Sequence, residues 1–254
     1  MTPITLDITT FDQTLPALLH ALGCEQDLRD APRIVIKPNL INASPPPVTT
    51  PLACCRALIE YICSVSQAEI ILAEGCGDPD MSTSTVFERL GYRQLAEETG
   101  VHLLDLNTAE LVRLRNANCP FLPEIYLPRI ALESYLISVP VLKAHSLAGI
   151  TGTLKNMIGL APPSHYAGRK GSWKKAALHA QVHQAIVDIN TYRSPDLSLM
   201  DASVGMAEYH LGGPTVDPPL GKLMAGLDPW AVDREAAELL GLDWQDIEHL
   251  RVRA

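Results

Sequence analysis

The stretch RIVIKPNLINASPPPVTTPLACCRALIEYICSVSQAEIILAEG, residues 33–75, decides the fold. It begins with a short apolar run, RIVIK, which is typical of a buried strand and ends at Pro38. After a loop with consecutive prolines, Thr50 is a good N-cap and Pro51 suits the first helical position, so a helix is predicted. The run EIILAEG then predicts a second strand that ends in a glycine turn. Strand, helix and strand in this order indicate a parallel sheet with a right-handed crossover.

The same alternation continues along the chain. Residues 82–100 predict a helix with a break at Gly91 and a stop at Gly100. Further strands are expected at VHLLDL (101–106), YLISVPVLK (135–143), LSLMD (197–201) and KLMAG (222–226), and further helices at 174–192 and 228–241. Together these elements predict an α/β fold, in which helices flank a mostly parallel open sheet.

One region departs from this alternation. Residues 107–129 are rich in proline and in short apolar runs, which is compatible with a β-rich insertion or with an irregular excursion. No internal repeat or low-complexity tract divides the chain. With 254 residues, one α/β domain over residues 1–254 is the expected organisation.

Composition and charge exclude several classes of function. Apolar residues make up 47% of the chain, so a large core can form, and the formal charge of -9 argues against nucleic acid as a partner. A basic segment, GRKGSWKK (168–175), either clamps an anion or is a solvated run. The first residues do not resemble a signal peptide, and no apolar run approaches the roughly 20 residues that cross a bilayer. We therefore expect a cytoplasmic protein that does not contact a membrane.

The cysteines do not form a metal-binding or ferredoxin pattern. None of the six belongs to a C-x-x-C pair, so no iron–sulfur cluster is expected in this chain. Most are expected to be reduced structural thiols, because Cys54, Cys55 and Cys63 fall in an apolar helical segment. Cys76, among glycines in EGCGDPD, is the one expected to face a site.

Polar side chains follow the predicted strands where each one ends. In open α/β sheets, ligands bind outside the carboxyl ends of the strands, so a shared polar site is predicted there. The alternative is that polar residues simply resume where a buried strand stops. The residues concerned are Lys37, Asn39, Glu74, Cys76, Lys143, His145, Asp201 and Asp228.

The segment LKAHSLAGITGTLKNMIGL, residues 142–160, has the composition of an anion site. Gly149 and Gly152 would let backbone N–H groups approach a ligand near a helix start. Lys155 and Asn156 add a cation and an amide one turn later and, with Lys143, suit a carboxylate or a phosphate. The spacing matches neither a P-loop nor G-x-G-x-x-G.

A metal site is a second hypothesis. His179 and His183 are four residues apart in a predicted helix, so they would share one face and could bind a divalent metal. Asp201 or Asp233 would complete the ligand set, whereas Asp188 lies off that face. The alternatives are packed histidines bonded to backbone carbonyls and an Asp233 that only favours the helix dipole.

Several motifs together resemble one known family. The segments IKPNL, ISVPVLKAH, TGTLKNMIG, AIVDI, LMDASVGM, GGP and GLDPWAVDREAAELLG look like the domain of unknown function 362 family, from about residue 33 to 242. Members are often fused to a ferredoxin module with two [4Fe-4S] clusters, so the resemblance implies redox-linked chemistry in many relatives. The ferredoxin cysteines are missing here, and a cluster would have to come from a separate ferredoxin.

The matched motifs and the side-chain chemistry together give a ranked set of functional hypotheses. The first is an enzyme acting on a small anionic metabolite by proton transfer or redox-linked chemistry. Lysines would bind the anion, and His145 would serve as acid or base with Asp201 or Asp233 orienting it. The others are the metal-binding protein and a non-catalytic partner of an iron–sulfur protein. The positions carried over are Lys37, Asn39, Lys143, His145, Lys155, Asn156, Asp188, Asp201, Gly213, Asp228 and Asp233, with Gly213 expected beside the substrate.

Overall fold

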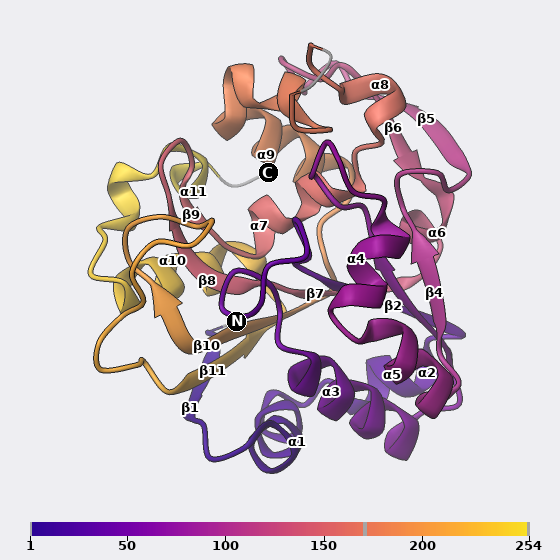
Figure 1. Cartoon of the computed structure of the whole chain (residues 1–254), viewed down its shortest axis with the longest axis vertical. Coiled ribbons are helices and arrows are strands. Elements are labelled where there is room, and N and C mark those ends of the chain that lie inside the picture. The colour runs from indigo at the N-terminus through magenta and orange to yellow at the C-terminus, as the bar shows by residue number, and fades with distance from the viewer. Residues whose placement is uncertain (1, 170–171, 253–254) are drawn as a thin grey trace.

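The computed structural model describes residues 2–169 and 172–252. In these residues one sheet has nine strands (Figure 1). Seven follow one another across the sheet in the order β1-β11-β10-β7-β2-β3-β4, and β8 and β9 branch from β10. The strands are β1 (Ile4–Asp7), β2 (Arg33–Pro38), β3 (Glu69–Glu74), β4 (His102–Asp105), β7 (Tyr135–Val139), β8 (Val141–His145), β9 (Gly149–Thr151), β10 (Leu197–Met206) and β11 (Lys222–Gly226).

The centre of the sheet is parallel and one edge is antiparallel. Strands β10, β7, β2, β3 and β4 run in the same direction, which confirms the mostly parallel α/β prediction. Strand β11 runs antiparallel to this block. Strand β1 pairs antiparallel with β11, with Ile4 opposite Ala225, so it runs in the direction of the block again. The predicted strand KLMAG is therefore present as β11, but its carboxyl end lies at the opposite edge from the others. Residues 207–221 contain no helix, and a parallel return to the sheet needs such a crossover.

Pro140 divides the predicted strand YLISVPVLK into two. Strand β10 pairs with β7 at Leu197 and Ser198 and then with β8 from Asp201 onward. Pro140 has no N–H to donate, but its carbonyl accepts the N–H of Asp201 at 2.9 Å, so the ladder is bridged. Strand β8 then turns back into the short antiparallel strand β9. This extension carries Lys143 and His145 beyond the end of β7.

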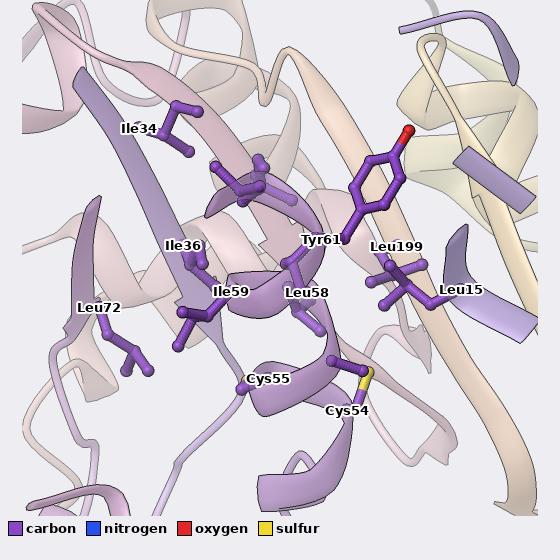
Figure 2. Close-up of a cluster of buried hydrophobic side chains, with 14 of the residues drawn as sticks. Leu15, Ile34, Ile36, Cys54, Cys55, Leu58, Ile59, Tyr61, Leu72 and Leu199 are labelled. Carbon is purple, nitrogen blue, oxygen red and sulfur yellow. The ribbon is translucent and has the colours of Figure 1, made fainter. Parts of the chain in front are cut away.

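Helices on one face of the sheet cover the first apolar cluster. They are α1 (Phe11–Leu22), α2 (Glu25–Asp30), α3 (Leu52–Val65), α4 (Thr83–Arg89) and α5 (Tyr92–Thr99). Helix α3 buries residues three and four positions apart, and Figure 2 shows Leu58 and Ile59 near Ile36, Leu72 and Leu199 of the strands. Each such side chain contributes about 1.5–3 kcal/mol to the free energy of unfolding. This layer fixes the strand ends where the polar residues lie.

Helix α3 begins one residue later than predicted. Its N-cap is Pro51, and the side chain of Thr50 makes no cap hydrogen bond. The Thr50 hydroxyl instead donates to the carbonyl of Val139 at 2.7 Å and accepts the N–H of Asn39 at 2.8 Å. The residue expected to cap the helix therefore joins the ends of β7 and β2.

The second face is covered by another set of helices, which lie above the sheet in Figure 1. They are α6 (Arg129–Leu132), α7 (Thr153–Asn156), α8 (Pro163–Tyr166), α9 (Val182–Tyr192), α10 (Pro229–Leu239) and α11 (Glu248–Arg251), with 3-10 turns η1 (Met157–Leu160), η2 (Ala176–Gln181) and η3 (Trp244–Asp246). The insertion at 107–129 contains β5 (Leu111–Arg115) and β6 (Glu124–Pro128), which form a separate antiparallel pair. Of the two alternatives, the β-rich insertion is confirmed.

The helix predicted over residues 174–192 is only partly correct. A 3-10 turn runs to Gln181, where φ is -141° and ψ is 63°, and the regular helix α9 starts at Val182. These angles are outside the helical region, so the two segments do not share one helical face. Across the described ranges, no helix combines the length and the apolarity needed to span a bilayer.

Candidate functional site

A cavity of about 360 Å³ opens at the carboxyl ends of β2, β3 and β8. Its wall is completed by α7, η1, η2 and the connection between β10 and β11. Much of its lining is polar or charged, namely Lys37, Asn39, Glu74, Lys143, His145, Thr151, Lys155, Asn156, Lys175, His179 and His210. Four of these carry an amine and one carries a carboxyl, so the cavity suits an anion. Of the predicted strand-end residues, Lys37, Asn39, Glu74, Lys143 and His145 lie together in this lining, whereas Cys76, Asp201 and Asp228 do not.

The floor of the cavity is a closed hydrogen-bond network around Lys37. Its Nζ donates to Glu74 Oε1 at 2.9 Å, to Asn156 Oδ1 at 3.1 Å and to the carbonyl of Pro38 at 3.2 Å. Burial lowers the pKa of Lys37, and the negative charge of Glu74 opposes that effect. An ammonium has three protons, so no donor remains for a ligand. Lys37 therefore lines the site but does not have the free donor that the sequence-based prediction required.

The other oxygen and backbone groups of this floor are equally well satisfied. Glu74 accepts the N–H of Gly75 at 2.7 Å and that of Leu40 at 2.9 Å. The amide of Asn156 donates to the Lys37 carbonyl at 3.1 Å. A Cβ at Gly159 would lie 2.4 Å from Lys37 Nζ, so only glycine permits η1 to pass this close. The floor thus joins β2, β3 and α7 into one rigid unit.

Lys143 and Lys175 are buried amines that bond to neutral acceptors. Lys143 Nζ donates to Asn39 Oδ1 at 2.7 Å and to the Val48 carbonyl at 2.5 Å. Burial, together with the charge of Lys155, lowers the pKa of Lys143 to about 7. Lys175 donates at 2.6–3.0 Å to two backbone carbonyls and to an asparagine side chain, and burial lowers its pKa to about 7.

Lys175 is a site residue that the strand-end argument missed. It is the last residue of the basic segment 168–175, and that composition was its only signal in the sequence. Lys174 points elsewhere, to the Met81 carbonyl and to Cys76 Sγ. Residues 170–171 of the segment lie outside the described residues. The segment was predicted either to clamp an anion or to be exposed to solvent, and the second alternative is wrong for Lys175, which is buried.

Lys155 differs from the other three lysines. It lines the cavity from α7, and its Nζ makes no hydrogen bond or ion pair with the described part of the chain. Burial and the nearby charge of Lys37 lower its pKa to about 8. Its charge also lowers the pKa values of His145, His179 and His210, which line the same cavity. Lys155 thus presents an ammonium that a ligand can bind.

Three histidines line the wall near Lys155. His145 Nδ1 accepts the N–H groups of Leu147 and Ala148, both at 3.1 Å, so the ring proton must be on Nε2. Burial, reinforced by Lys155, lowers the pKa of His145 to about 2, which keeps the ring neutral. His179 has the opposite tautomer, because its Nδ1 lies 3.3 Å from the Lys175 carbonyl and must donate to it. Its Nε2 is therefore a proton acceptor.

The third imidazole was missed by the sequence analysis. His210 stacks on His145 with ring centroids 3.9 Å apart, and burial lowers its pKa to about 3. It lies in the connection between β10 and β11, where no strand end pointed to it. His179 is 6.4 Å from His145 by ring centroids. It was predicted as a metal ligand and instead joins this group.

The metal set proposed from the sequence does not converge. The backbone change at Gln181 separates His179 from His183, whose Nδ1 lies 2.9 Å from Nδ1 of His249. Asp233 accepts the N–H groups of Thr153 and Leu154 at 2.6 and 2.9 Å. Within residues 2–169 and 172–252, no group of three or more His, Cys, Asp or Glu side chains has a geometry that could hold a metal.

Asp233 also binds the backbone groups beside Gly152. The N–H groups at the start of α7, which were predicted to meet an anion, are bonded to Asp233. A Cβ at Gly152 would lie 2.4 Å from that carboxyl, so glycine is required by Asp233 itself. Gly149 has φ of +75° and faces Ile247. Neither glycine is part of the cavity lining.

Other predicted residues lie away from the cavity. Strand β10 continues past Asp201, whose carboxyl accepts the Ser203 N–H at 2.9 Å. The charge of Asp201 contributes to the raised pKa values of Cys54 and Cys55, which belong to helix α3 on the other face of the sheet. Asp201 is therefore outside the cavity lining and apart from the other residues predicted to be catalytic. Gly213 donates its N–H to the Tyr209 carbonyl and is not in the lining.

Two carried-over aspartates and one cysteine also have structural partners. Asp188 accepts the N–H groups of Phe121 and Leu122 and so holds the insertion to α9. Asp228 caps α10 at the opposite edge of the sheet, because β11 is antiparallel. Cys76 is buried and outside the cavity lining, with Sγ 3.3 Å from the Met81 carbonyl, so it does not face the site.

Fold and cavity together define an α/β protein with a cationic, histidine-lined cavity at its strand ends. The chain belongs to the family described as Domain of unknown function (DUF362), whose pattern matches residues 34–238. This match confirms the resemblance seen in the motifs.

Two solved structures have a similar fold. One is the lactate racemase apoprotein from Thermoanaerobacterium thermosaccharolyticum, with a TM-score of 0.56, 14% identity and coverage of 92% of this chain and 56% of that one. The other is a crystal structure of a protein from Thermotoga maritima, with a TM-score of 0.52, 14% identity and coverage of 93% of this chain and 60% of that one. The chain thus spans little more than half of each, and at this identity the likeness shows the fold alone. No curated protein matches the chain in sequence.

Proposed function

We propose that this protein is an enzyme that binds a small anionic metabolite, in the first place a carboxylate, and transfers a proton to or from it. The observation that carries the proposal is the Lys155 ammonium, which faces the cavity and has no partner among the described residues. A charged amine held in such a place lacks the hydrogen bonds that it would have in water. An anion restores them, and Lys143 has one further proton to donate.

The histidines divide the proton-transfer roles between them. His179 has a free Nε2 lone pair and would accept a proton, while the Nε2–H of His145 would donate a hydrogen bond to an oxygen of the substrate. This assignment alters the sequence-based hypothesis, which gave the acid–base role to His145. The backbone N–H groups of Leu147 and Ala148, in place of an aspartate, orient His145.

The fold comparison supports a carboxylate in particular. One structure of similar fold is named as a lactate racemase apoprotein, and lactate is a 2-hydroxy carboxylate. Proton transfer beside a carboxylate needs a cation for the anion, a base for the proton and a hydrogen-bond donor for the adjacent oxygen. Lys155, His179 and His145 meet these three needs from one cavity.

Binding of lactate, pyruvate and inorganic phosphate, measured by isothermal titration calorimetry, tests the first half of the proposal. Lys155→Met should weaken binding at least about tenfold, because a hydrogen bond to a charged group contributes about 1.5–3 kcal/mol. Arg169→Met is the matched control, since it removes a cation outside the cavity lining and should leave affinity unchanged. Equal affinities for Lys155→Met and the unaltered protein would refute the anion site.

Exchange of the methyl protons of pyruvate in D2O, followed by proton NMR, tests the second half. The protein should accelerate the exchange, and His179→Gln should abolish the acceleration while leaving pyruvate affinity within about twofold. If His179→Gln and the unaltered protein exchange protons at the same rate, the base has been assigned to the wrong residue.

A further inference from the structure

The mouth of the cavity differs in chemistry from its interior. Among the described residues, four large apolar side chains are substantially exposed: Leu147 (56%), Trp173 (37%), Tyr209 (46%) and Val252 (47%). The first three line the cavity, and Val252 does not. Single exposed apolar residues are ordinary, but a group of them at one opening marks a place where apolar surface is covered by something else.

These three residues, here called the apolar rim, come from the same segments that build the wall. Leu147 donates its N–H to His145 Nδ1, so the rim continues directly from the imidazole. Tyr209 precedes His210, and their ring centroids are 5.0 Å apart. Trp173 lies just before Lys175 and packs near the backbone of Gly77. The apolar rim is therefore held in a fixed relation to the cationic interior.

The size of the cavity points in the same direction. A volume of about 360 Å³ corresponds to about a dozen water molecules, at about 30 Å³ each. A three-carbon hydroxy acid would fill only about half of that space. The cavity has room for an anionic group and for a second portion of similar size, and that second portion would extend toward the rim.

We propose that the ligand of this cavity is an amphipathic anion, with a carboxylate that binds Lys155 and an apolar portion that contacts Leu147, Trp173 and Tyr209. This inference rests on the proposed anion site and adds the class of molecule that enters it. The apolar portion gains affinity because it leaves water, by about fourfold for each methylene that becomes buried. Acids with a chain or ring of about four to eight carbons match the available space.

A series of carboxylates separates the two parts of the ligand. The probes are acetate, butanoate, hexanoate and 3-phenylpropanoate, with calorimetry for affinity and tryptophan fluorescence as a second signal. Affinity should rise at each step, and 3-phenylpropanoate should bind at least about tenfold more tightly than acetate while altering the emission of Trp173. The neutral 3-phenylpropanamide should bind at least about tenfold more weakly than its acid, because it cannot pair with Lys155.

Variants of the rim show whether the gain comes from these residues. Trp173→Ala should reduce the affinity for 3-phenylpropanoate toward that for acetate and leave acetate unchanged, whereas Trp173→Phe should retain most of the gain. Val252→Ala, the matched control, removes an equally exposed side chain away from the cavity and should change nothing. Should Trp173→Ala fail to fold, Leu147→Ser removes apolar area from the same rim.

The possible failures are distinguishable. Equal affinity for all four carboxylates, with Lys155→Met still abolishing binding, would overturn the amphipathic ligand and leave the anion site intact. Tight binding of the amide together with the acid would also overturn it, because the carboxylate would then contribute nothing. No binding of any carboxylate, or binding that survives Lys155→Met, would overturn the proposed function and this inference with it.

Discussion

The floor and the wall of the cavity use the same residue types in opposite ways. On the floor, Lys37 donates to Glu74, Asn156 and a carbonyl. The turn η1 approaches Lys37 so closely at Gly159 that there is no room for a Cβ. On the wall, Lys155 has no partner in the described chain, and the histidines around it are neutral. A lysine in a cavity is therefore not by itself a ligand-binding residue. Where its protons go decides whether it supports the fold or is available to a ligand.

The sharpest test of this contrast is to break the floor. Lys37→Met should lower the free energy of unfolding by about 3–5 kcal/mol, because it leaves the Glu74 carboxylate buried without its cation. Urea unfolding measures the loss, and the double variant Lys37→Met with Glu74→Gln should recover part of it. A loss below about 1 kcal/mol would show that the ion pair does not support the fold.

A smaller effect is expected from crowding the floor. Gly159→Ala places a Cβ within 2.4 Å of Lys37 Cε and Nζ, so the lysine or η1 must move. Overpacking of this kind costs about 1–3 kcal/mol. Gly100→Ala is not a suitable control, because Gly100 has a positive φ that alanine adopts poorly. Ala176→Gly is the better control, since it makes a change of one methyl group in the lining of the same cavity. Unchanged urea midpoints for Gly159→Ala would contradict the close approach.

The wall should respond in the opposite direction. Lys155→Met removes an unpaired, partly buried charge, so the free energy of unfolding should stay the same or rise by up to about 1 kcal/mol while anion binding is lost. Urea unfolding and calorimetry on one preparation measure both. A loss of more than about 2 kcal/mol would mean that Lys155 belongs with the floor.

The stability of the folded protein should also depend on pH. The folded-state pKa values of Lys143 and Lys175 are about 7 and that of Lys155 is about 8, all below the ordinary value of 10.5. Between pH 7 and 8.5 the unfolded chain then binds more protons than the folded one, so stability without ligand should rise with pH. The Tm followed over this range should increase, and Lys155→Met should flatten the slope. A Tm that falls over this window would contradict the lowered pKa values.

Anion affinity should change with pH in the opposite sense. Binding needs a protonated Lys155, so affinity should decline as pH rises through about 8. A saturating carboxylate should therefore raise the Tm more at pH 7 than at pH 9. An affinity that stays constant across this range would show that the anion does not bind the Lys155 ammonium.

Local signals in the sequence were enough for most of the fold. The alternation of apolar runs with well-marked helix starts and glycine stops predicted the parallel block, because each signal lies within a few residues of the element it describes. The direction of β11 could not be read in this way, since it depends on the connection that precedes it. The break at Gln181 was also invisible, because the apolar periodicity continues across it.

The site was predictable to the extent that strand ends define it. Lys37, Asn39, Lys143, His145, Lys155 and Asn156 converge as expected. The hydrogen-bond partners of these residues lie far away in the sequence. The ion pair of Lys37 with Glu74 and the capping of α7 by Asp233 therefore had no local sequence signal. Asp201 was misplaced because the strand continues beyond it, and His210 was missed because it lies in a long connection with no regular structure.

The pairing of β1 with β11 bears on how the molecule is made. Residues 4–7 pair with residues 222–225, so β1 must wait until β11 has been synthesised before that edge can close. Until then β10 presents an open row of backbone donors and acceptors, which is the kind of surface that recruits other chains. Nascent protein interrupted before residue 222 would therefore depend on chaperones to stay out of aggregates.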